Sequence, residues 1–306
     1  MATSLTSPGL VFASDKAIIA ARPALEKVTL FATDFTDDAV TKGTTLTVPV
    51  FSGSAADFNP GSSHGYNDPE GSVKWAQVSF STHKKCTYGL TDKDSTLVET
   101  SPLWAKAGPA AGGAVGKALT SAVASLLTYT AATQISSWSC TLANMAALRG
   151  SCATNNFDPA NCVVILEPAT YATLLALLPS NVIGDGSAVV TGILRGLFGF
   201  KAVIEGTQIS KQSGVGEASA AVNKGVGYVV PADAICVGCR TIQPQDGTCV
   251  EFGTATDEIT GFTFGHRITV DQNSGQRNYT VEALMGAALS LQSSNGAPGF
   301  LQLVTA

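Results

Sequence analysis

Gly61, Ser63 and Gly65 form a G-x-S-x-G pattern, which in many hydrolases presents a serine nucleophile. Such a serine lies on a strained turn between a buried strand and a helix, but here Pro60 and the polar residues 66–69 place Ser63 inside a loop. The general base would have to be one of three histidines: His64, His83 and His266. None of them stands in a recognisable carboxylate-supported context, so an oligomeric serine hydrolase using Ser63 and His64 is an alternative that the pattern does not favour.

A second pattern, at Gly116 and Lys117, suggests a phosphate-binding loop. That motif needs a glycine five positions before Gly116, where Ala111 stands, and Ser or Thr at the position of Ala118. Two of its required positions therefore fail. A stripe of small residues that packs against another helix explains this segment better.

Cys236 and Cys239 form a single C-x-x-C pair, without a second pair or a histidine at zinc-binding spacing. On a strand their side chains would point to opposite faces, which favours core burial over metal binding. The acidic residues Asp34, Asp37 and Asp38 lie near a predicted turn or cap, which accounts for them without a metal ion. The sequence therefore predicts no catalytic residue, no cofactor and no metal site.

The elements around the G-x-S-x-G pattern are more informative than the pattern itself. Residues 44–51 and 73–80 both alternate apolar and polar side chains, as half-buried strands do. The 20 residues 52–71 between them are rich in Gly, Ser, Asn, Asp and Pro but include Phe58 and Tyr66. Because a hairpin needs only about 2–5 loop residues, we expect a long two-stranded arm that finishes its packing against another chain.

The rest of the chain predicts a mixture of helices and strands. Residues 101–129 carry small and apolar side chains at spacings of three and four, which predicts a long Ala-rich helix. Helices predicted at 138–149 and 169–178 alternate with strands at 162–166, 201–205, 227–230 and 234–237. Residues 259–268 and 278–284 flank a turn at 271–275, and we expect this hairpin to complete a sheet against the Ala-rich helix.

Composition favours an assembled protein. Charged residues form 13% of the 306-residue chain, about half the usual share. Much of the exterior is therefore expected to contact other subunits, although abundant Ser and Thr would also solvate it. The net charge of −5 and the lack of a Lys/Arg-rich tract argue against sequence-specific nucleic-acid binding. Polar residues interrupt the charge-free stretch 118–148, so no membrane span is expected, and the seven scattered cysteines predict reduced, mostly buried thiols.

Two local passages and the order of the elements resemble those of a known family. Residues 161–171, NCVVILEPATY, are similar to the strand-Pro-helix passage in the axial domain of the major capsid proteins of tailed bacteriophages. Residues 197–204, LFGFKAVI, resemble the later L-x-G-x-P-V strand entry of that family, without its usual proline. The resemblance implies the Hong Kong 97-like capsid fold, which is of the α+β class.

The resemblance also implies a division of the chain into five segments. An N-terminal arm over residues 1–40 would precede an extended β-hairpin loop over 41–84 and a peripheral domain with a spine helix over 85–134. An α/β axial domain would then occupy 135–245. Residues 246–306 would return to the peripheral domain as a long β-hairpin and the C-terminus.

The implied function is that of a major capsid protein. Copies of the chain would self-assemble into the pentamers and hexamers of an icosahedral shell that encloses a double-stranded DNA genome without sequence-specific binding. Separate scaffolding, portal and decoration proteins would be its other partners, and no membrane is implied. The chain would be synthesised in the host bacterial cytoplasm and reside in the virion. An encapsulin-type compartment shell, which shares the fold but encloses protein cargo, stays open as an alternative.

Six residues are predicted to contact neighbouring subunits: Phe51, Phe58, Tyr66, Trp75, Asp271 and Asn273. The aromatic residues would be apolar anchors of the extended loop, whereas Asp271 and Asn273 belong to the tip of the peripheral hairpin. The alternative for Phe51 and Trp75 is that they pack within their own subunit's sheet. No lysine lies between Phe51 and Gly71, so the Lys–Asn isopeptide bond of some relatives is not expected.

Overall fold

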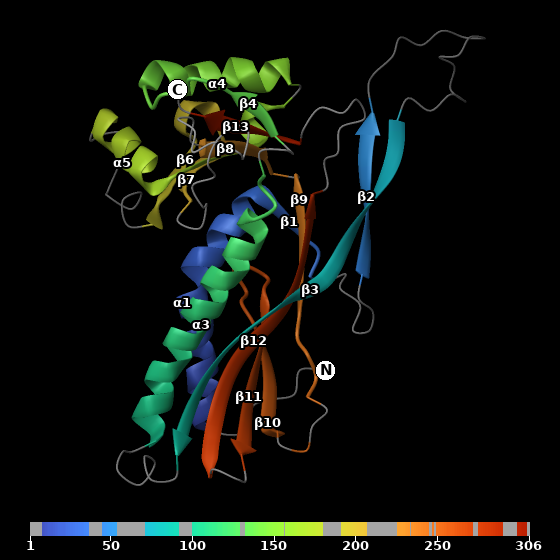
Figure 1. Ribbon diagram of the computed structural model, residues 1–306, viewed down its shortest axis with the longest axis vertical. Coiled ribbons are helices and arrows are strands. Elements are labelled where there is room, and N and C mark those ends of the chain that lie inside the picture. Colours follow the sequence, from blue (N-terminus) through green and yellow to red (C-terminus); the bar gives the residue numbers. More distant parts are fainter. Residues whose placement is uncertain are drawn as a thin grey trace, which may run out of the picture.

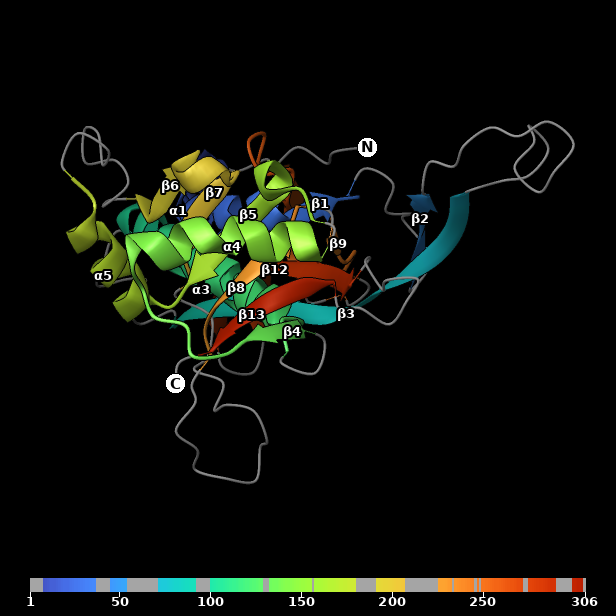
Figure 2. The same ribbon diagram turned by 90° about the horizontal axis from the view of Figure 1, so that it is seen from above.

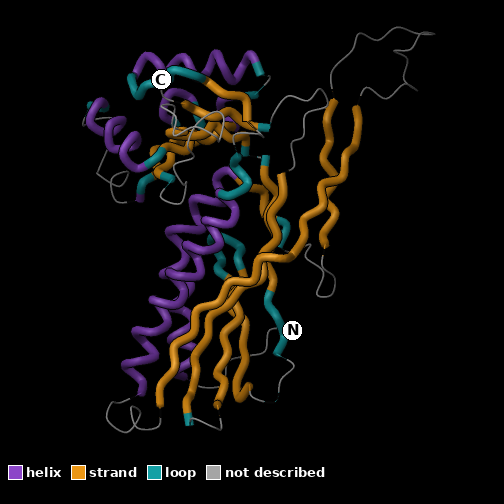
Figure 3. The backbone as a smooth tube through the Cα atoms, in the orientation of Figure 1, coloured by secondary structure: helices purple, strands orange, loops and turns teal. Residues whose placement is uncertain are grey.

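The computed structural model describes residues 8–36, 45–53, 71–91, 100–128, 132–155, 157–179, 191–206, 225–232, 234–244, 247, 249–271, 275–289 and 299–304. Two long helices, α1 (Pro8–Phe31) and α3 (Thr100–Ala124), lie side by side along a sheet (Figures 1 and 3). A smaller α/β lobe, which contains α4 (Leu142–Thr154) and α5 (Pro168–Leu177), stands at one end of the helix pair.

The described strands form two sheets. The seven-stranded sheet contains β1 (Ala32–Asp34), β2 (Thr45–Gly53), β3 (Gly71–Thr91), β9 (Ile235–Arg240), β10 (Cys249–Thr256), β11 (Thr263–Asp271) and β12 (Gln276–Leu289). The six-stranded sheet contains β4 (Ala132–Ile135), β5 (Cys162–Leu166), β6 (Ile193–Arg195), β7 (Ala202–Glu205), β8 (Gly225–Pro231) and β13 (Phe300–Val304). Short 3-10 helices at Pro159–Asn161 and Leu197–Gly199 complete the lobe.

The seven-stranded sheet is organised around β12. This strand pairs antiparallel with β11, with β9 and with β3, and the sheet runs in the order β1-β9-β12-β11-β10. β3 pairs with β12 along its second half and with β2 along its first half. Figure 2 shows that β2 and the part of β3 paired with it stand away from the rest of the molecule.

The helix pair α1–α3 packs very closely because small residues line the contact. A Cβ atom added at Gly112 would lie only 2.0 Å from the carbonyl oxygen of Ala17, and one added at Gly116 would lie 3.0 Å from Ala21. The corresponding distance from Gly108 to the carbonyl oxygen of Ala13 is 2.4 Å. Side chains would hold the two backbones apart, so glycine is required where the helices meet.

One continuous core lies between this helix pair and the sheets. It combines α1 residues such as Leu25 and Val28 with Leu119 of α3 and with Val281 of β12. A second core fills the lobe, where β5 is buried along its whole length. Burial on both faces explains why β5 is a continuous run of Cys, Val, Ile and Leu instead of an alternating strand.

Several sequence predictions are confirmed closely. The strand at 162–166 is β5 and the helix at 169–178 is α5. The Ala-rich helix predicted at 101–129 is α3, which ends earlier, at Ala124. The hairpin around residues 271–275 is also present, because Asp271 of β11 pairs with Gln276 of β12. This hairpin lies in the same sheet as β3, so the lobe that contains α3 is discontinuous in sequence, as expected.

Other parts of the structure differ from the predicted segments. Most of the arm expected over residues 1–40 is helix α1, whose buried Ala and Leu residues pack along α3. The axial segment expected over 135–245 includes β9, which belongs to the seven-stranded sheet. The return segment expected over 246–306 ends in β13, which pairs with β4 and β8 in the other sheet.

The helix predicted at 138–149 also has different ends. α4 begins after Thr141, whose side chain accepts a hydrogen bond from the Asn144 N–H, and it runs through Gly150 to Thr154. The helix continues past Gly150, and Cys152, which lies one turn after Leu148, is buried on the same face as Leu148. Within the described residues no helix has both the length and the apolar character needed to cross a bilayer. None of the seven cysteines, all of which the structure describes, forms a disulfide.

Candidate assembly surface

The projecting part of the hairpin β2–β3 has one packed face and one open face. Val48 and Val78 lie on the same face near its base and pack in one cluster with Cys236 of β9, so the hairpin is held to the body there. Residues of β3 alternate between the two faces. Trp75 therefore lies on the opposite face from Val78, where it pairs across the strands with Pro49.

Trp75 is the most exposed aromatic side chain among the described residues, at 64%. Its cross-strand partner Pro49 is also exposed, as are Thr47 and Gln77 on the same face. A tryptophan that packed within its own sheet would be largely buried, so the alternative role proposed for Trp75 does not describe this subunit. Within the described ranges, the other large apolar side chains that are exposed are Ile19, Tyr88, Leu142, Leu177, Val250 and Ile259.

The other predicted contact residues are only partly visible. Phe51 lies in β2, where it pairs with Val73, but its side chain lies outside the described part of the structure. Phe58, Tyr66 and Asn273 lie outside the described residues altogether. Asp271 is exposed at the end of β11. Trp75 and Asp271 are thus on the surface, and they stay predictions as contact residues.

A second surface feature lies on the other side of the molecule, where α1 and α3 meet β5, β6 and β7. A cavity of about 420 Å³ opens there. Its apolar lining includes Phe31, Leu127, Ile165, Ile193 and Ile204. Helices α1 and α3 therefore contribute to a buried core along most of their length and to an open hollow beside the lobe.

Charged side chains surround this hollow. The Lys27 ammonium donates to the backbone carbonyl of Glu205 at 3.0 Å and lies 3.9 Å from the Glu205 carboxylate. Burial lowers the pKa of Lys27, although the Glu205 carboxylate opposes that effect. Arg22, Glu26 and Lys117 also line the hollow, so the cations Arg22, Lys27 and Lys117 and the carboxylates Glu26 and Glu205 surround its apolar floor.

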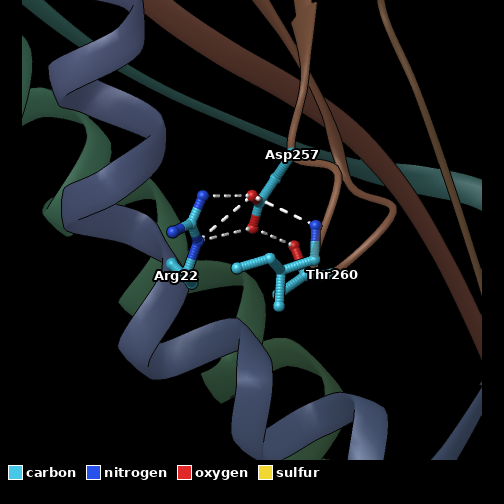
Figure 4. A network of polar contacts seen from close by, with 4 residues as sticks. Arg22, Asp257 and Thr260 are labelled. Carbon is cyan, nitrogen blue, oxygen red and sulfur yellow. Dashed lines mark hydrogen bonds and ion pairs between the residues drawn. The ribbon is translucent and has the colours of Figure 1, made fainter.

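Arg22 links this side of α1 to the β10–β11 turn (Figure 4). Its guanidinium donates to the Asp257 carboxylate, with an Nη2–Oδ1 distance of 2.8 Å. The Thr260 hydroxyl donates to the other oxygen of the same carboxylate, Oδ2, at 2.6 Å. Burial is the largest influence on the pKa of Asp257 and raises it, but hydrogen bonds from Arg22, Thr260 and the Ile259 N–H leave the pKa lowered overall. The carboxylate therefore remains ionised and fixes α1 to the sheet.

The polar groups inside the sheet also pair with one another. Glu282 accepts hydrogen bonds from Arg267 and from His83 Nε2, the latter at 3.1 Å. His266 is buried beside the Tyr279 hydroxyl, and burial lowers its pKa to about 4, so it is neutral at pH 7. These side chains connect neighbouring strands of the sheet.

The candidate chemical motifs do not come together in the described residues. Ser63 and His64, and likewise Asp37 and Asp38, lie outside them. Asp34 accepts hydrogen bonds from the N–H and hydroxyl of Thr36, so it organises a turn as predicted. No group of His, Cys, Asp and Glu side chains within the described ranges is arranged to hold a metal ion.

The two remaining motifs have the structural roles that the sequence predicts. Cys236 faces Val48 and Val78, whereas Cys239 lies on the opposite side of β9 in the main core. Burial raises the pKa of Cys239 to about 12, so its thiol is protonated and unreactive at pH 7. Gly116 packs against Ala21, which makes the segment around Lys117 a helix contact and not a phosphate loop.

Sequence reasoning missed the hollow and the Arg22–Asp257 ion pair because it missed α1. A signal was present: Ala13, Ala17, Ala21, Leu25 and Val28 recur at spacings of four, four, four and three. That spacing is typical of one helix face. The ion pair joins residues that are 235 positions apart, and no local pattern relates them.

Solved structures of phage proteins resemble this fold. The chain is similar to a structure from Mycobacterium phage Che8, with a TM-score of 0.55, 11% identity, and coverage of 91% of this chain and 90% of that chain. It is similar to the capsid of Ralstonia phage GP4, with a TM-score of 0.56, 9% identity, and coverage of 90% and 86%. A structure from Microbacterium phage Oxtober96 has a TM-score of 0.51 at 11% identity and covers 90% of both chains.

No protein-family model and no curated protein sequence matches this chain. At these identities the likeness concerns the fold alone. The chain is a mixed α+β protein with the fold of phage capsid proteins, which confirms the predicted resemblance to tailed-phage major capsid proteins at that level.

Proposed function

We propose that this protein is a major capsid protein whose copies self-assemble into an icosahedral shell around a double-stranded DNA genome. The observation that carries the proposal is the likeness to the capsid of Ralstonia phage GP4, which extends over 90% of this chain and 86% of that one. Only 10% of this chain lies outside that likeness, which leaves little of it to supply a separate activity.

In this proposal the parts of the fold take the roles known from Hong Kong 97-like subunits. The hairpin β2–β3 is the extended loop, α3 is the spine helix, and β11–β12 is the long hairpin of the peripheral domain. The lobe built on β5 is the axial domain, with β13 as its C-terminal strand. The domain limits shift accordingly, because β9 joins the peripheral sheet and α1 packs along the spine helix.

Association with other copies would use the predicted contact residues. The exposed Trp75 supports this proposal, because burying a large aromatic side chain at the centre of an interface is strongly favourable. Phe51, Phe58 and Tyr66 act beside it on the extended loop, and Asp271 and Asn273 act at the tip of the β11–β12 hairpin. DNA is enclosed without sequence reading, consistent with a net charge of −5.

The protein is accordingly proposed to reside in the virion after synthesis in the host cytoplasm. Its main partner is a second copy of itself, in pentamers and hexamers. Scaffolding, portal and decoration proteins would be separate chains. Nothing in the described structure favours the encapsulin-type shell or the serine hydrolase over this function.

Electron microscopy of the purified full-length chain tests the proposal. Uniform closed particles with icosahedral symmetry are the expected result, and a protein that stays monomeric at high concentration would contradict it. The variant Phe58→Ala/Tyr66→Ala should remain folded by circular dichroism but form far fewer particles. Tyr88→Ala, which removes an exposed aromatic side chain from the other end of β3, is the matched control.

A further inference from the structure

The hollow beside the lobe has the properties of a receiving site. Its floor is formed by apolar side chains of α1, α3, β5, β6 and β7, and its volume of about 420 Å³ lies in the range of cavities that bind a ligand or a partner's side chain. The exposed Ile19, at 51%, extends the apolar surface outward along α1. Exposed apolar surface of this kind usually marks a contact with another molecule.

The rim of the hollow restricts what would enter it. Arg22 is held by Asp257, and Lys27 is held by Glu205, so their charges are partly neutralised inside the subunit. Lys117 is exposed on α3 at the same rim. Cations above an apolar floor favour an aromatic ring, whose face attracts positive charge.

Trp75 is the complementary feature. It is a large, amphipathic and exposed aromatic side chain on a part of β3 that is paired only with β2. Figures 1 and 2 agree that the hairpin and the side of the molecule with β6 and β7 face in opposite directions. Trp75 therefore cannot reach the hollow of its own subunit.

We propose that the hollow between α1, α3 and β5–β7 receives the β2–β3 hairpin of a second copy of this chain, with Trp75 as the anchor. This inference rests on the proposed capsid function and adds the receiving surface to it. Because donor and acceptor lie on opposite sides of one subunit, the contact is head-to-tail. Contacts of that type generate rings when the rotation between subunits closes.

Size and charge are consistent with this arrangement. A tryptophan buries about 150–250 Å², whereas a stable interface buries about 800 Å² from each partner, so Trp75 would be the centre of a larger contact made by the hairpin. Residues 54–70, which connect β2 and β3, include Asp57, Asp68 and Glu70 but no lysine or arginine. Their charge is opposite to that of the cations at the rim.

Photochemical cross-linking tests the contact directly. The photoreactive amino acid p-benzoylphenylalanine replaces Trp75 in the full-length chain, and isotopically labelled and unlabelled chains are assembled together and irradiated. Mass spectrometry should find mixed-isotope cross-links from position 75 to residues 19–31 or 117–127. The same probe at Tyr88 is the matched control and should not give cross-links to these residues.

The outcomes separate this inference from the proposed function. Particles with cross-links from position 75 to other surfaces would overturn the inference and leave the capsid function standing. A small amphiphile found in the hollow of assembled particles would overturn it in the same way. Failure of the unmodified chain to form particles under any condition would overturn both.

A variant series provides a second test. Trp75→Ala should raise the concentration needed for assembly by about tenfold or more, as expected for an interface anchor. Lys117→Glu should raise it to a smaller extent, and Lys106→Glu, a matched exposed position on the same helix, should leave it unchanged. If Trp75 and Lys117 belong to one contact, the double variant should show less than the sum of the two single effects. If the effects of the two single variants simply added in the double variant, the proposed contact between Trp75 and the hollow would be overturned.

Discussion

The two halves of β3 are parts of one continuous strand, but their surroundings are different. Residues 80–91 pair with β12 inside the sheet, where His83 also reaches the buried Glu282. Residues 71–79 pair only with β2, and Trp75 on this half is 64% exposed. The inner half finds its partners within the chain, whereas the outer half leaves its largest apolar side chain without cover.

This difference separates folding from association. The inner half belongs to a body whose helices and sheets share one continuous core. The outer half contributes little to the folding stability of a single subunit. Under the proposed function, its apolar surface stabilises the assembly when a second copy covers it. Substitutions in the body should therefore change stability, and substitutions on the outer hairpin should change assembly.

The largest loss of stability is expected from Gly112→Ala. Glycine to alanine in a helix ordinarily stabilises it by roughly 0.5–1 kcal/mol, but here the new Cβ would lie 2.0 Å from the Ala17 carbonyl oxygen and force α1 and α3 apart. We expect a net destabilisation on the order of 3 kcal/mol, measured by chemical denaturation.

Gly113→Ala is the matched control for that variant. The nearest atom to its added Cβ is the Ala20 carbonyl oxygen at 3.7 Å, an ordinary contact distance. Gly113→Ala should therefore leave stability unchanged or raise it slightly. Equal effects of the two variants would show that the close contact of α1 and α3 does not hold the body together.

A smaller loss is expected from Asp257→Asn, which weakens the ion pair between α1 and the β10–β11 turn. Asp257 is 1% exposed, but Arg22 is 32% exposed and partly hydrated, so we expect about 2 kcal/mol at pH 7. Asp158→Asn, at an exposed 3-10 helix cap where asparagine is also accepted, is the control and should cost little.

The Asp257 carboxylate should also make the stability of the protein depend on pH. Its folded pKa is lowered, so its contribution to stability is complete above the unfolded value of about 3.9 and disappears as the pH falls through the folded pKa. The unfolding free energy of the unsubstituted protein should therefore fall below about pH 4, and Asp257→Asn should fall less steeply. Parallel pH profiles of the two proteins would exclude Asp257 as a source of the acid sensitivity.

The smallest effect on stability is expected from Trp75→Ala. An exposed side chain that packs little within its subunit should change the unfolding free energy of the monomer by less than about 0.5 kcal/mol, although the same variant should impair assembly. Chemical denaturation of dilute protein measures the first effect and sedimentation measures the second. A loss of monomer stability of several kcal/mol would mean that Trp75 serves its own subunit, and the contrast between the two halves of β3 would be lost.

Much of this fold was predictable where the signal is local. The continuous apolar run of β5 indicates a strand buried on both faces, and the Ala spacing of α3 indicates a helix that packs closely. The turn at 271–275 specifies the β11–β12 hairpin. Alternation in residues 73–80 indicates a strand, but it does not reveal that β3 continues to Thr91 or that Trp75 lies on its open face.

The sequence by itself determined α3, α5, β5, the β11–β12 hairpin and the low share of charged residues, because hydrophobic period, turn residues and composition act over short stretches of chain. Only the tertiary structure decided that β9 joins β12, that Arg22 meets Asp257 across 235 positions, and that an apolar hollow opens beside Lys117. Such contacts depend on which surfaces remain to be buried once all the elements are packed together. That is a property of the whole chain, and no single segment contains it.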